Sequence, residues 1–516
     1  MLFNSYEFIL AFLPLTALIF FLLGRKGFFQ GAIAWLVCAS LFFYGWWEPK
    51  YLVLLCGSIA VNFLVGSSLQ RLHNRDAKLS YRKWLLTLGI ALNVVTLGYF
   101  KYANFIVDNI QNITGIDYHL DKIILPLAIS FFTFQQIAFV VDAYKGQIKD
   151  LSLLHYCLFV TFFPQLIAGP IVHHSYVLPQ FAKPETFSPR VRNIVIGFVI
   201  FTLGLFKKVM LADSVSVYAT PVFDMANSGG EIGMASAWLG VLAYTCQLYF
   251  DFSGYSDMAI GLGRIFGISL PLNFNSPYKS VNIIEFWTRW HITLSQFLRG
   301  YLYYPMVLGR SSTTLLYMAL VFVMLLGGLW HGAGWTYIIW GGIHGLYLVA
   351  NYLWRTLRGA RRSHTSLARF GAGVLTFFAV VISLVPFRTE SIAGTIHMLR
   401  SMFGIGGIQL PLQAGNLPFM NHLVDSNIVE LSGNLAATPA AGIALTAALL
   451  AIIFLWPNTQ QLVRNFLDTK YYRVEAGLLH QVTWKPNLAW AIIIGLIFIS
   501  TIMVLDRPTE FLYFQF

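Results

Sequence analysis

The 44 residues 311–354 read SSTTLLYMALVFVMLLGGLWHGAGWTYIIWGGIHGLYLVANYLW and contain no Asp, Glu, Lys or Arg. Two apolar segments, 313–330 and 335–354, flank a corner that is broken by Gly332 and Gly334. Each segment has about the length that a helix needs to cross the ~30 Å hydrocarbon core of a bilayer. The stretch therefore predicts two membrane-spanning helices joined by a tight turn.

The rest of the chain follows the same pattern. Of its 516 residues 57% are hydrophobic and only 11% are charged, whereas about 25% are charged in a soluble domain. We predict an all-α, polytopic transmembrane bundle of about 11–13 spans, forming a single domain over 1–516. The predicted spans are 5–24, 28–47, 51–70, 84–102, 123–141, 193–212, 235–255, 313–330, 335–354, 369–387, 440–456 and 488–506.

The net charge of +12 gives the expected orientation and does not indicate nucleic-acid binding, because the basic residues cluster in short loops between apolar runs. Such loops normally face the cytoplasm. Alternation then places 213–234 and both termini on the opposite side. The predicted cytoplasmic segments are Arg25-Lys26, 71–83, Lys145 with Lys149, 267–300, the cluster Arg355/Arg358/Arg361/Arg362 and 458–486.

Two stretches do not fit simple spans. Residues 151–172 are apolar but end in FPQLIAGP (163–170), and counting them as a span would break the charge alternation. We expect a re-entrant or interfacial hairpin buried by its neighbours. Residues 267–300 are too polar to span and rich in aromatic side chains, and we expect interfacial helices lying against the bundle.

Three histidines are candidates for chemistry. An ionisable side chain inside a membrane is a functional-site hypothesis by default, and histidine exchanges a proton near neutral pH. His331 and His344 both lie in the uncharged stretch, and His291 lies in FWTRWHITLS (286–295). The residues alone leave an alternative for each: a helix-end cap for His331, close helix packing for His344 and an interfacial Trp/Arg belt for His291.

Other polar groups are expected to be structural. Asp251 and Asp257 end an apolar run, and we expect one of them to bond locally and the other to pair with Arg264. The adjacent pair His173-His174 is interpreted as a surface feature. There is no Gly-x-Ser-x-Gly elbow, Walker loop or His-Glu-x-x-His, and the glycines of 261–267 have the wrong spacing for a dinucleotide fingerprint.

Several strings, in order, resemble one family. They are SFFTFQQ (130–136), VDAY (141–144), FPQLIAGPI (163–171), the 249–267 block, FWTRWH (286–291), WHG (330–332) and WGGIHG (340–345). They resemble the membrane-bound O-acyltransferase superfamily, in particular its bacterial branch of alginate O-acetylases and D-alanyl-lipoteichoic acid transferases, and the likeness as a whole covers about residues 30–390. Residues 391–516 would add C-terminal helices.

The resemblance implies roles for single residues. His331 corresponds to the essential histidine and His291 to its companion, with a funnel or tunnel through the bundle. Substrate-binding roles fall to Arg289, Trp290, Trp330 and Gly332, and supporting roles to Asp251, Asp257 and His344. No metal and no bound cofactor are expected.

We therefore expect a membrane-bound O-acyltransferase that takes an acyl group, most simply acetyl, from a cytoplasmic donor. The donor would be a thioester, acetyl-CoA or an acylated carrier protein, and would serve O-acetylation of an exported polysaccharide such as alginate. Separate periplasmic proteins would complete the transfer. The expected location is the bacterial inner membrane, with several passes and both termini periplasmic. The alternatives are transfer of D-alanyl or another acyl group to an envelope polymer, and a proton-coupled transporter or channel.

Overall fold

The computed structural model describes residues 1–516 except 117–119, 149–151, 359–364, 406–407, 412–428, 433–439, 468–478, 480, 508–511 and 513–516. Lys149, Arg361 and Arg362, which contributed to the predicted orientation, lie outside the described residues. Helices dominate the described part, and two four-residue strands form one short parallel pair.

The first half of the chain contains η1 (Glu7–Phe12), α1 (Leu13–Arg25), α2 (Phe29–Gly45), α3 (Tyr51–Asn74), α4 (Leu79–Leu97), η2 (Gly98–Tyr102), α5 (Ala103–Thr114), α6 (Ile129–Tyr144), α7 (Leu153–Thr161), α8 (Phe163–Leu166), α9 (His174–Phe181), η3 (Pro184–Phe187), α10 (Val191–Phe206), η4 (Lys207–Ala212), α11 (Asp213–Ser228) and α12 (Met234–Ile265).

The second half contains η5 (Pro277–Lys279), α13 (Ile283–Arg289), α14 (Ile292–Phe297), η6 (Leu298–Tyr303), α15 (Tyr304–Val307), α16 (Thr313–His331), α17 (Trp335–Arg358), α18 (Ser366–Arg388), α19 (Ile392–Met402), β1 (Ile408–Pro411), β2 (Val429–Ser432), α21 (Ala440–Leu455), α22 (Thr459–Leu462), η8 (Arg464–Phe466) and α23 (Leu488–Ile502). Several of these helices begin where a side chain caps the free N–H groups of the first turn. The capping residues are Ser312, Thr365, Ser391, Asn458 and Asn487.

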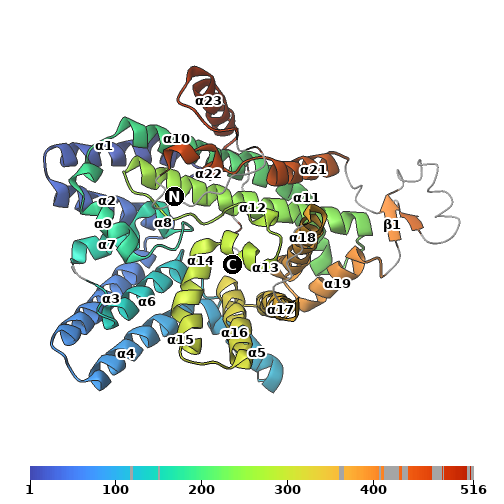
Figure 1. Cartoon of the computed structure of the whole chain (residues 1–516), viewed down its shortest axis with the longest axis horizontal. Helices are drawn as coiled ribbons and strands as arrows, with labels where there is room; N and C mark the ends of the chain where they lie inside the picture. The colour runs from blue at the N-terminus through green and yellow to red at the C-terminus, as the bar shows by residue number, and fades with distance from the viewer. Residues whose placement is uncertain are drawn as a thin grey trace.

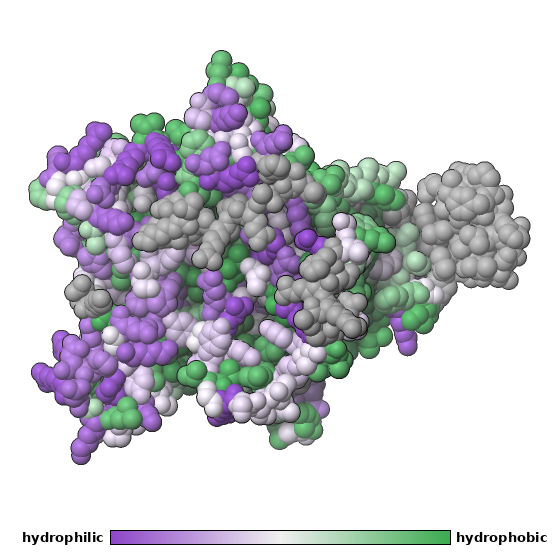
Figure 2. Space-filling view, in the orientation of Figure 1, coloured by the Kyte–Doolittle hydropathy of each residue, from purple (hydrophilic) through white to green (hydrophobic). Residues whose placement is uncertain are grey.

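Within the described residues, six continuous helical segments are long and apolar enough to cross a membrane, and α2, α21 and α23 are shorter apolar helices. The number is smaller than the predicted 11–13 because α6 has only 16 residues, and because α12 and α17 carry polar residues among their apolar ones. Helix α17 contains the predicted span 335–354 and is not among the six. Large apolar side chains such as Ile113 and Leu357 are exposed on the outer surface. In the face shown in Figure 2, hydrophobic residues gather around α11, α18 and α21. The chain is a multi-pass membrane protein.

The centre of the molecule is α12, which runs across the middle of Figure 1. Its residues Tyr255–Ile265 belong to a core formed mainly by the N-terminal half, whereas Ala237–Phe252 belong to a second core with α16–α19. Glycines let α10 approach α12 closely: a Cβ atom added to Gly254 would lie 2.7 Å from the carbonyl oxygen of Gly204. Small residues at such a crossing allow two membrane helices to pack backbone against backbone.

Three segments refine the sequence interpretation. Residues 213–228, predicted as part of a loop, continue the preceding helix as α11 through the π-helical turn η4. Helix α7 has nine residues and is about 14 Å long, too short to cross the bilayer. This agrees with a segment that does not span.

The third segment is 267–300, which was expected to lie against the bundle. Its aromatic side chains are instead buried: Phe274, Tyr278, Phe286, Trp287 and Trp290 are each exposed by 7% or less. They form part of the second core, because α13 lies next to α17 and η5 lies next to α18.

Candidate active site

His331 is the last residue of α16, and its position is fixed by two side chains from the segment η2. Lys101 Nζ donates hydrogen bonds to the carbonyl oxygens of Trp330 and His331, and the hydroxyl of Tyr102 donates to the carbonyl of Leu329 at 2.9 Å. These carbonyls lie at the C-terminal end of a helix, where cations and donors are stabilising. Sequence analysis missed this role for Lys101, although a charge inside the predicted span 84–102 was a visible signal.

Aromatic rings surround the His331 imidazole. Its ring centroid lies 4.9 Å from that of Trp330, 5.2 Å from Trp340 and 5.2 Å from Phe387. Gly332 follows in an extended conformation, and a Cβ atom there would overlap the ring of Tyr337. The glycine thus makes room for a packed tyrosine, which explains its presence without a contact to substrate.

His291 lies beside His331, with the two ring centroids 6.4 Å apart. The side chain is fully buried, and its backbone is in the left-handed region, with φ 41° and ψ 55°. This conformation is strained for a residue with a side chain, and such strain is often stored at functional sites. The structure therefore brings together two histidines that are 40 residues apart in sequence, one from the α13–α14 junction and one from the end of α16.

The hydrogen bonds of Asn273 determine which His291 nitrogen carries the proton. Asn273 Oδ1 accepts from the backbone N–H of Thr293 at 3.3 Å and lies 3.2 Å from His291 Nδ1. Since this oxygen is an acceptor, Nδ1 must be the donor. Nε2 then offers a lone pair, and it has no hydrogen-bond partner among the described residues. Burial lowers the pKa of His291 to about 3, so the neutral form prevails.

His344 is also fully buried, but both of its nitrogens are engaged. The indole N–H of Trp287 donates to Nδ1 at 3.3 Å, so Nε2 carries the proton and faces the Ser383 hydroxyl at 2.9 Å. The Ser383 hydroxyl in turn donates to the carbonyl of Val380 at 2.6 Å. His344 therefore joins α13, α17 and α18 through a saturated network.

The predicted substrate-binding residues occupy different places. Trp290 packs beside Phe286 and, together with His331, lines the central cavity. Trp330 stacks on Phe134 with a centroid distance of 5.3 Å. Arg289 does not reach His331: it forms an ion pair with Glu285 at 2.7 Å and lines a separate cavity.

Asp251 and Asp257 pair with lysines, not with Arg264, so the expected partner was wrong. Asp251 lies 2.6 Å from Lys208 Nζ, and Asp257 lies 2.6 Å from Lys207 Nζ. The two acids are six residues apart and project from different sides of α12, and the adjacent lysines of η4 meet one each. The Arg264 guanidinium lies near Ser269 Oγ at 3.2 Å. Sequence analysis missed both lysines, which lie inside the predicted span 193–212.

A set of cavities meets at these residues. The central cavity is lined by Asp251, Trp290, His331, Trp340 and His344, among others. It shares His331 with a larger cavity that Trp47, Lys101 and Lys122 help to line. It shares Tyr278 with another larger cavity, whose lining includes Lys279, Arg289 and Arg369. His331 thus lies where two of the three cavities meet.

The interpretation of His173-His174 as a surface feature was wrong for His174. The side chain of His174 is buried, and that of the neighbouring Asp142 is only 2% exposed. The two histidines converge on Asp142 because the backbone changes from extended to helical between them.

Comparison with known proteins gives the family. The family model described as MBOAT, membrane-bound O-acyltransferase, matches residues 64–384. The chain is similar over its full length to a peptidoglycan O-acetyltransferase of Helicobacter pylori, with 39% identity and 98% of that protein covered. It is also similar over its full length to a probable alginate O-acetylase of Pseudomonas aeruginosa, with 36% identity and 100% of that protein covered.

A teichoic acid D-alanyltransferase of Streptococcus thermophilus is 30% identical over 44% of this chain and 57% of its own length. The family match covers more than half of the chain and two relatives match from end to end. The chain therefore belongs to the membrane-bound O-acyltransferase family and is an acyltransferase.

Proposed function

We propose that this protein moves an acetyl group from a cytoplasmic thioester, across the membrane, for O-acetylation of an exported envelope polysaccharide. The observation that carries the proposal is the position of His331, where the central cavity meets the cavity beside Lys101. An acyl donor and a hydroxyl acceptor could approach this imidazole from different cavities.

The cavity that shares Tyr278 with the central cavity has basic side chains in its lining, and these support a donor that carries phosphate groups. Lys279, Arg289 and Arg369 contribute to its lining, and lysine and arginine bind phosphates by charge and hydrogen bonding. Acetyl-CoA and an acylated carrier protein both have a phosphate-bearing pantetheine arm. In this proposal the thioester is a substrate, and the transfer uses no bound cofactor.

The proposed reaction balances with one proton acceptor. His331 takes the proton of the acceptor hydroxyl as the oxygen attacks the thioester carbonyl, and a tetrahedral oxyanion forms. The C–S bond then breaks, the ester forms and the departing thiolate receives the proton from His331. General base catalysis of this kind contributes about 10²–10⁴-fold.

The oxyanion needs a hydrogen-bond donor, and we assign this role to the Trp340 indole. Its buried N–H has no hydrogen-bond partner among the described residues, and the ring lines the central cavity beside His331. Preorganised donors at a developing negative charge are worth several kcal/mol. His291 fits this role less well than the sequence suggested, because its neutral Nε2 accepts and does not donate. His291 suits another role: its Nε2 can accept a hydrogen bond from the incoming hydroxyl and so orient it.

The relatives support an envelope polysaccharide as the acceptor and acetyl as the transferred group. Two full-length relatives carry O-acetyltransferase or O-acetylase in their names, one for peptidoglycan and one for alginate. The match to a D-alanyltransferase is partial, so acetyl is favoured over D-alanyl. We propose that the chain lies in the bacterial inner membrane with both termini periplasmic, and that periplasmic proteins complete the transfer.

The test is mass spectrometry of surface polymers from a wild-type strain and a strain that lacks this protein. We expect acetyl ester to disappear from one polysaccharide and to return with the wild-type protein but not with His331→Ala. His155→Ala, a histidine on α7, serves as the matched control and should restore acetylation. Loss confined to muropeptides would identify peptidoglycan, and loss confined to secreted uronate polymer would identify alginate. Unchanged acetylation of every envelope polymer would refute the proposal.

A further inference from the structure

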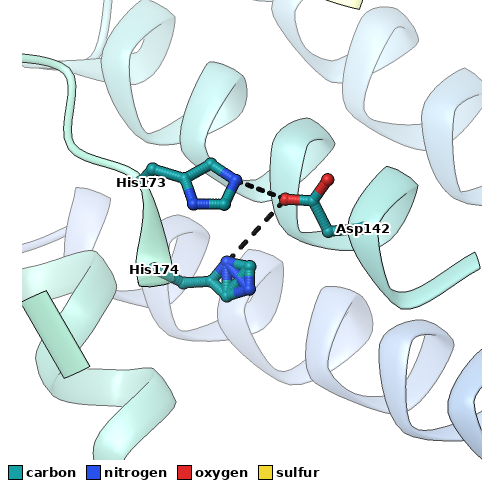
Figure 3. A group of neighbouring side chains, drawn as sticks. All are labelled: Asp142, His173 and His174. Atoms are coloured by element: carbon teal, nitrogen blue, oxygen red, sulfur yellow. Dashed lines mark hydrogen bonds and ion pairs between the residues drawn. The ribbon is translucent and has the colours of Figure 1, made fainter. Parts of the chain in front are cut away.

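A second group of polar side chains lies apart from the cavity of His331. Asp142, near the end of α6, faces His173 and His174 at the start of α9, and both rings point toward its carboxylate (Figure 3). His173 Nε2 lies 2.5 Å and His174 Nδ1 3.8 Å from Asp142 Oδ2. One ligand atom from each of the three residues lies within 4.8 Å of the others.

The local backbone explains how adjacent histidines can share a target. His173 is extended, with φ −90° and ψ 142°, and caps α9, whereas His174 is the first helical residue. The change of direction brings the rings to one side, with centroids 4.4 Å apart. Within a regular helix, neighbouring side chains would diverge by 100°.

The hydrogen bonds place His173 in a form that suits metal binding. The backbone N–H of Ser175 donates to His173 Nδ1 at 3.3 Å, so Nε2 carries the proton and donates it to Asp142. A metal ion on Nε2 would replace that proton. Nδ1 could then carry a proton and donate to the Ser175 hydroxyl, which lies 2.6 Å away. Metal-bound histidines usually have such a partner on the other nitrogen.

Tyr301 from η6 completes the surroundings. Its hydroxyl lies 2.9 Å from Asp142 Oδ2 and 2.8 Å from His173 Nε2. The phenol donates its proton to the carboxylate, which can only accept. Such a hydrogen bond fixes the orientation of a carboxylate that binds a metal ion.

We propose that Asp142, His173 and His174 bind one divalent transition-metal ion, of which Zn²⁺ fits best. Two imidazoles and one carboxylate are ligands typical of Zn²⁺, whereas Mg²⁺ and Ca²⁺ prefer oxygen ligands alone. The side chain of His173 is 36% exposed, which leaves an open side where water can supply a fourth ligand.

The spacing requires only a small adjustment. Tetrahedral Zn²⁺ holds its ligand atoms about 3.4 Å apart, so the 3.8 Å separation would shrink and the 2.5 Å separation would widen. Tyr301 lies on η6, which continues α14, the helix that begins after His291. The ion would thus connect α6, α9 and the segment that carries one active-site histidine.

The experiment uses the full chain in detergent, freed of metal by a chelator. Zn²⁺ is titrated against a chromophoric chelator, and Co²⁺ is added separately to record its visible absorption. We expect about one ion per chain and a Co²⁺ spectrum of a nitrogen- and oxygen-ligated site. Asp142→Asn and His174→Gln should weaken binding by more than the 10–100-fold that is typical for loss of an outer partner.

His155→Gln is the matched control, because it removes a histidine of α7 outside the group and should bind as the wild type does. The proposal would be wrong if the wild-type protein took up no ion, or if it bound Zn²⁺ no more tightly than Asp142→Asn does. The three residues would then form a hydrogen-bonded cluster without a metal ion. If a variant does not fold, the stoichiometry and Co²⁺ spectrum of the wild type still decide. Acyl transfer plays no part in these readouts, so they stand apart from the proposed function.

Discussion

Two histidine groups in this protein differ in what surrounds them. His291 and His331 lie among aromatic rings, and the hydrogen-bond partner of His291 is the neutral amide of Asn273. His173 and His174 face a carboxylate. A neutral, apolar setting keeps an imidazole uncharged and able to accept a proton. A carboxylate beside two imidazoles favours a cation, so we expect the two histidine groups to differ in function because their neighbours differ.

The largest difference should follow from removing the active-site imidazole. His331→Ala should lower acyl transfer by about 10²–10⁴-fold, because the base is lost, while abundance in the membrane stays near wild type. His174→Ala, the counterpart in the other group, should retain transfer within about tenfold. Initial rates with purified protein and an acetyl thioester measure both. Equal losses in the two variants would remove the functional distinction between the groups.

A smaller effect on acyl transfer should follow from removing the hydrogen bond between Asn273 and His291. Asn273→Ala removes the acceptor that holds Nδ1–H, so kcat should fall roughly tenfold, about 1.4 kcal/mol, with little change in KM. Thr293→Val is the control, since it removes the hydroxyl that bonds Asn273 and the Ile171 N–H and leaves the His291 contact. A loss in Thr293→Val as large as that in Asn273→Ala would mean that the site responds to local packing and not to the His291 proton.

His344 should affect stability more than chemistry. His344→Phe leaves the Trp287 indole N–H buried without its acceptor, which costs about 1–3 kcal/mol. Thermal unfolding in detergent should show a lower Tm, and kcat should stay within about tenfold. Ser383→Ala keeps the Trp287 bond but leaves the His344 Nε2–H without its acceptor, so it should lower Tm by a similar amount. If His344→Phe folded well but lost all activity, His344 would have a role in the chemistry, as is proposed for His331.

The smallest expected effect on acyl transfer concerns Tyr301. In metal-free protein, Tyr301→Phe removes a hydrogen bond to the Asp142 carboxylate, worth about 1.5–3 kcal/mol at most, and leaves transfer unchanged. The phenyl ring can keep its contact with Lys145, whose Nζ lies 5.6 Å from the ring centroid. Tm and the transfer rate are the measurements. A drop in transfer without a drop in Tm would connect this group to the chemistry.

The buried ions of η4 show what a hydropathy reading overlooks. Lys207 and Lys208 were counted within an apolar run, and Asp251 and Asp257 were assigned other partners. In the structure the side chain of Lys208 is only 1% exposed and contacts Asp213 as well as Asp251. A charge inside a membrane requires a partner, but the partner lies on another helix that no local pattern identifies.

The sequence by itself determined the membrane class, the helical composition and the family resemblance, because apolar length and ordered motifs are local properties. It also pointed to His331 as the candidate base. It also indicated His291 through the resemblance. Tertiary structure alone decided which residues meet: Lys101 at the end of α16, Asn273 on His291 and Asp142 between His173 and His174. Each of these contacts joins segments far apart in the chain, and only helix packing brings them within hydrogen-bonding distance.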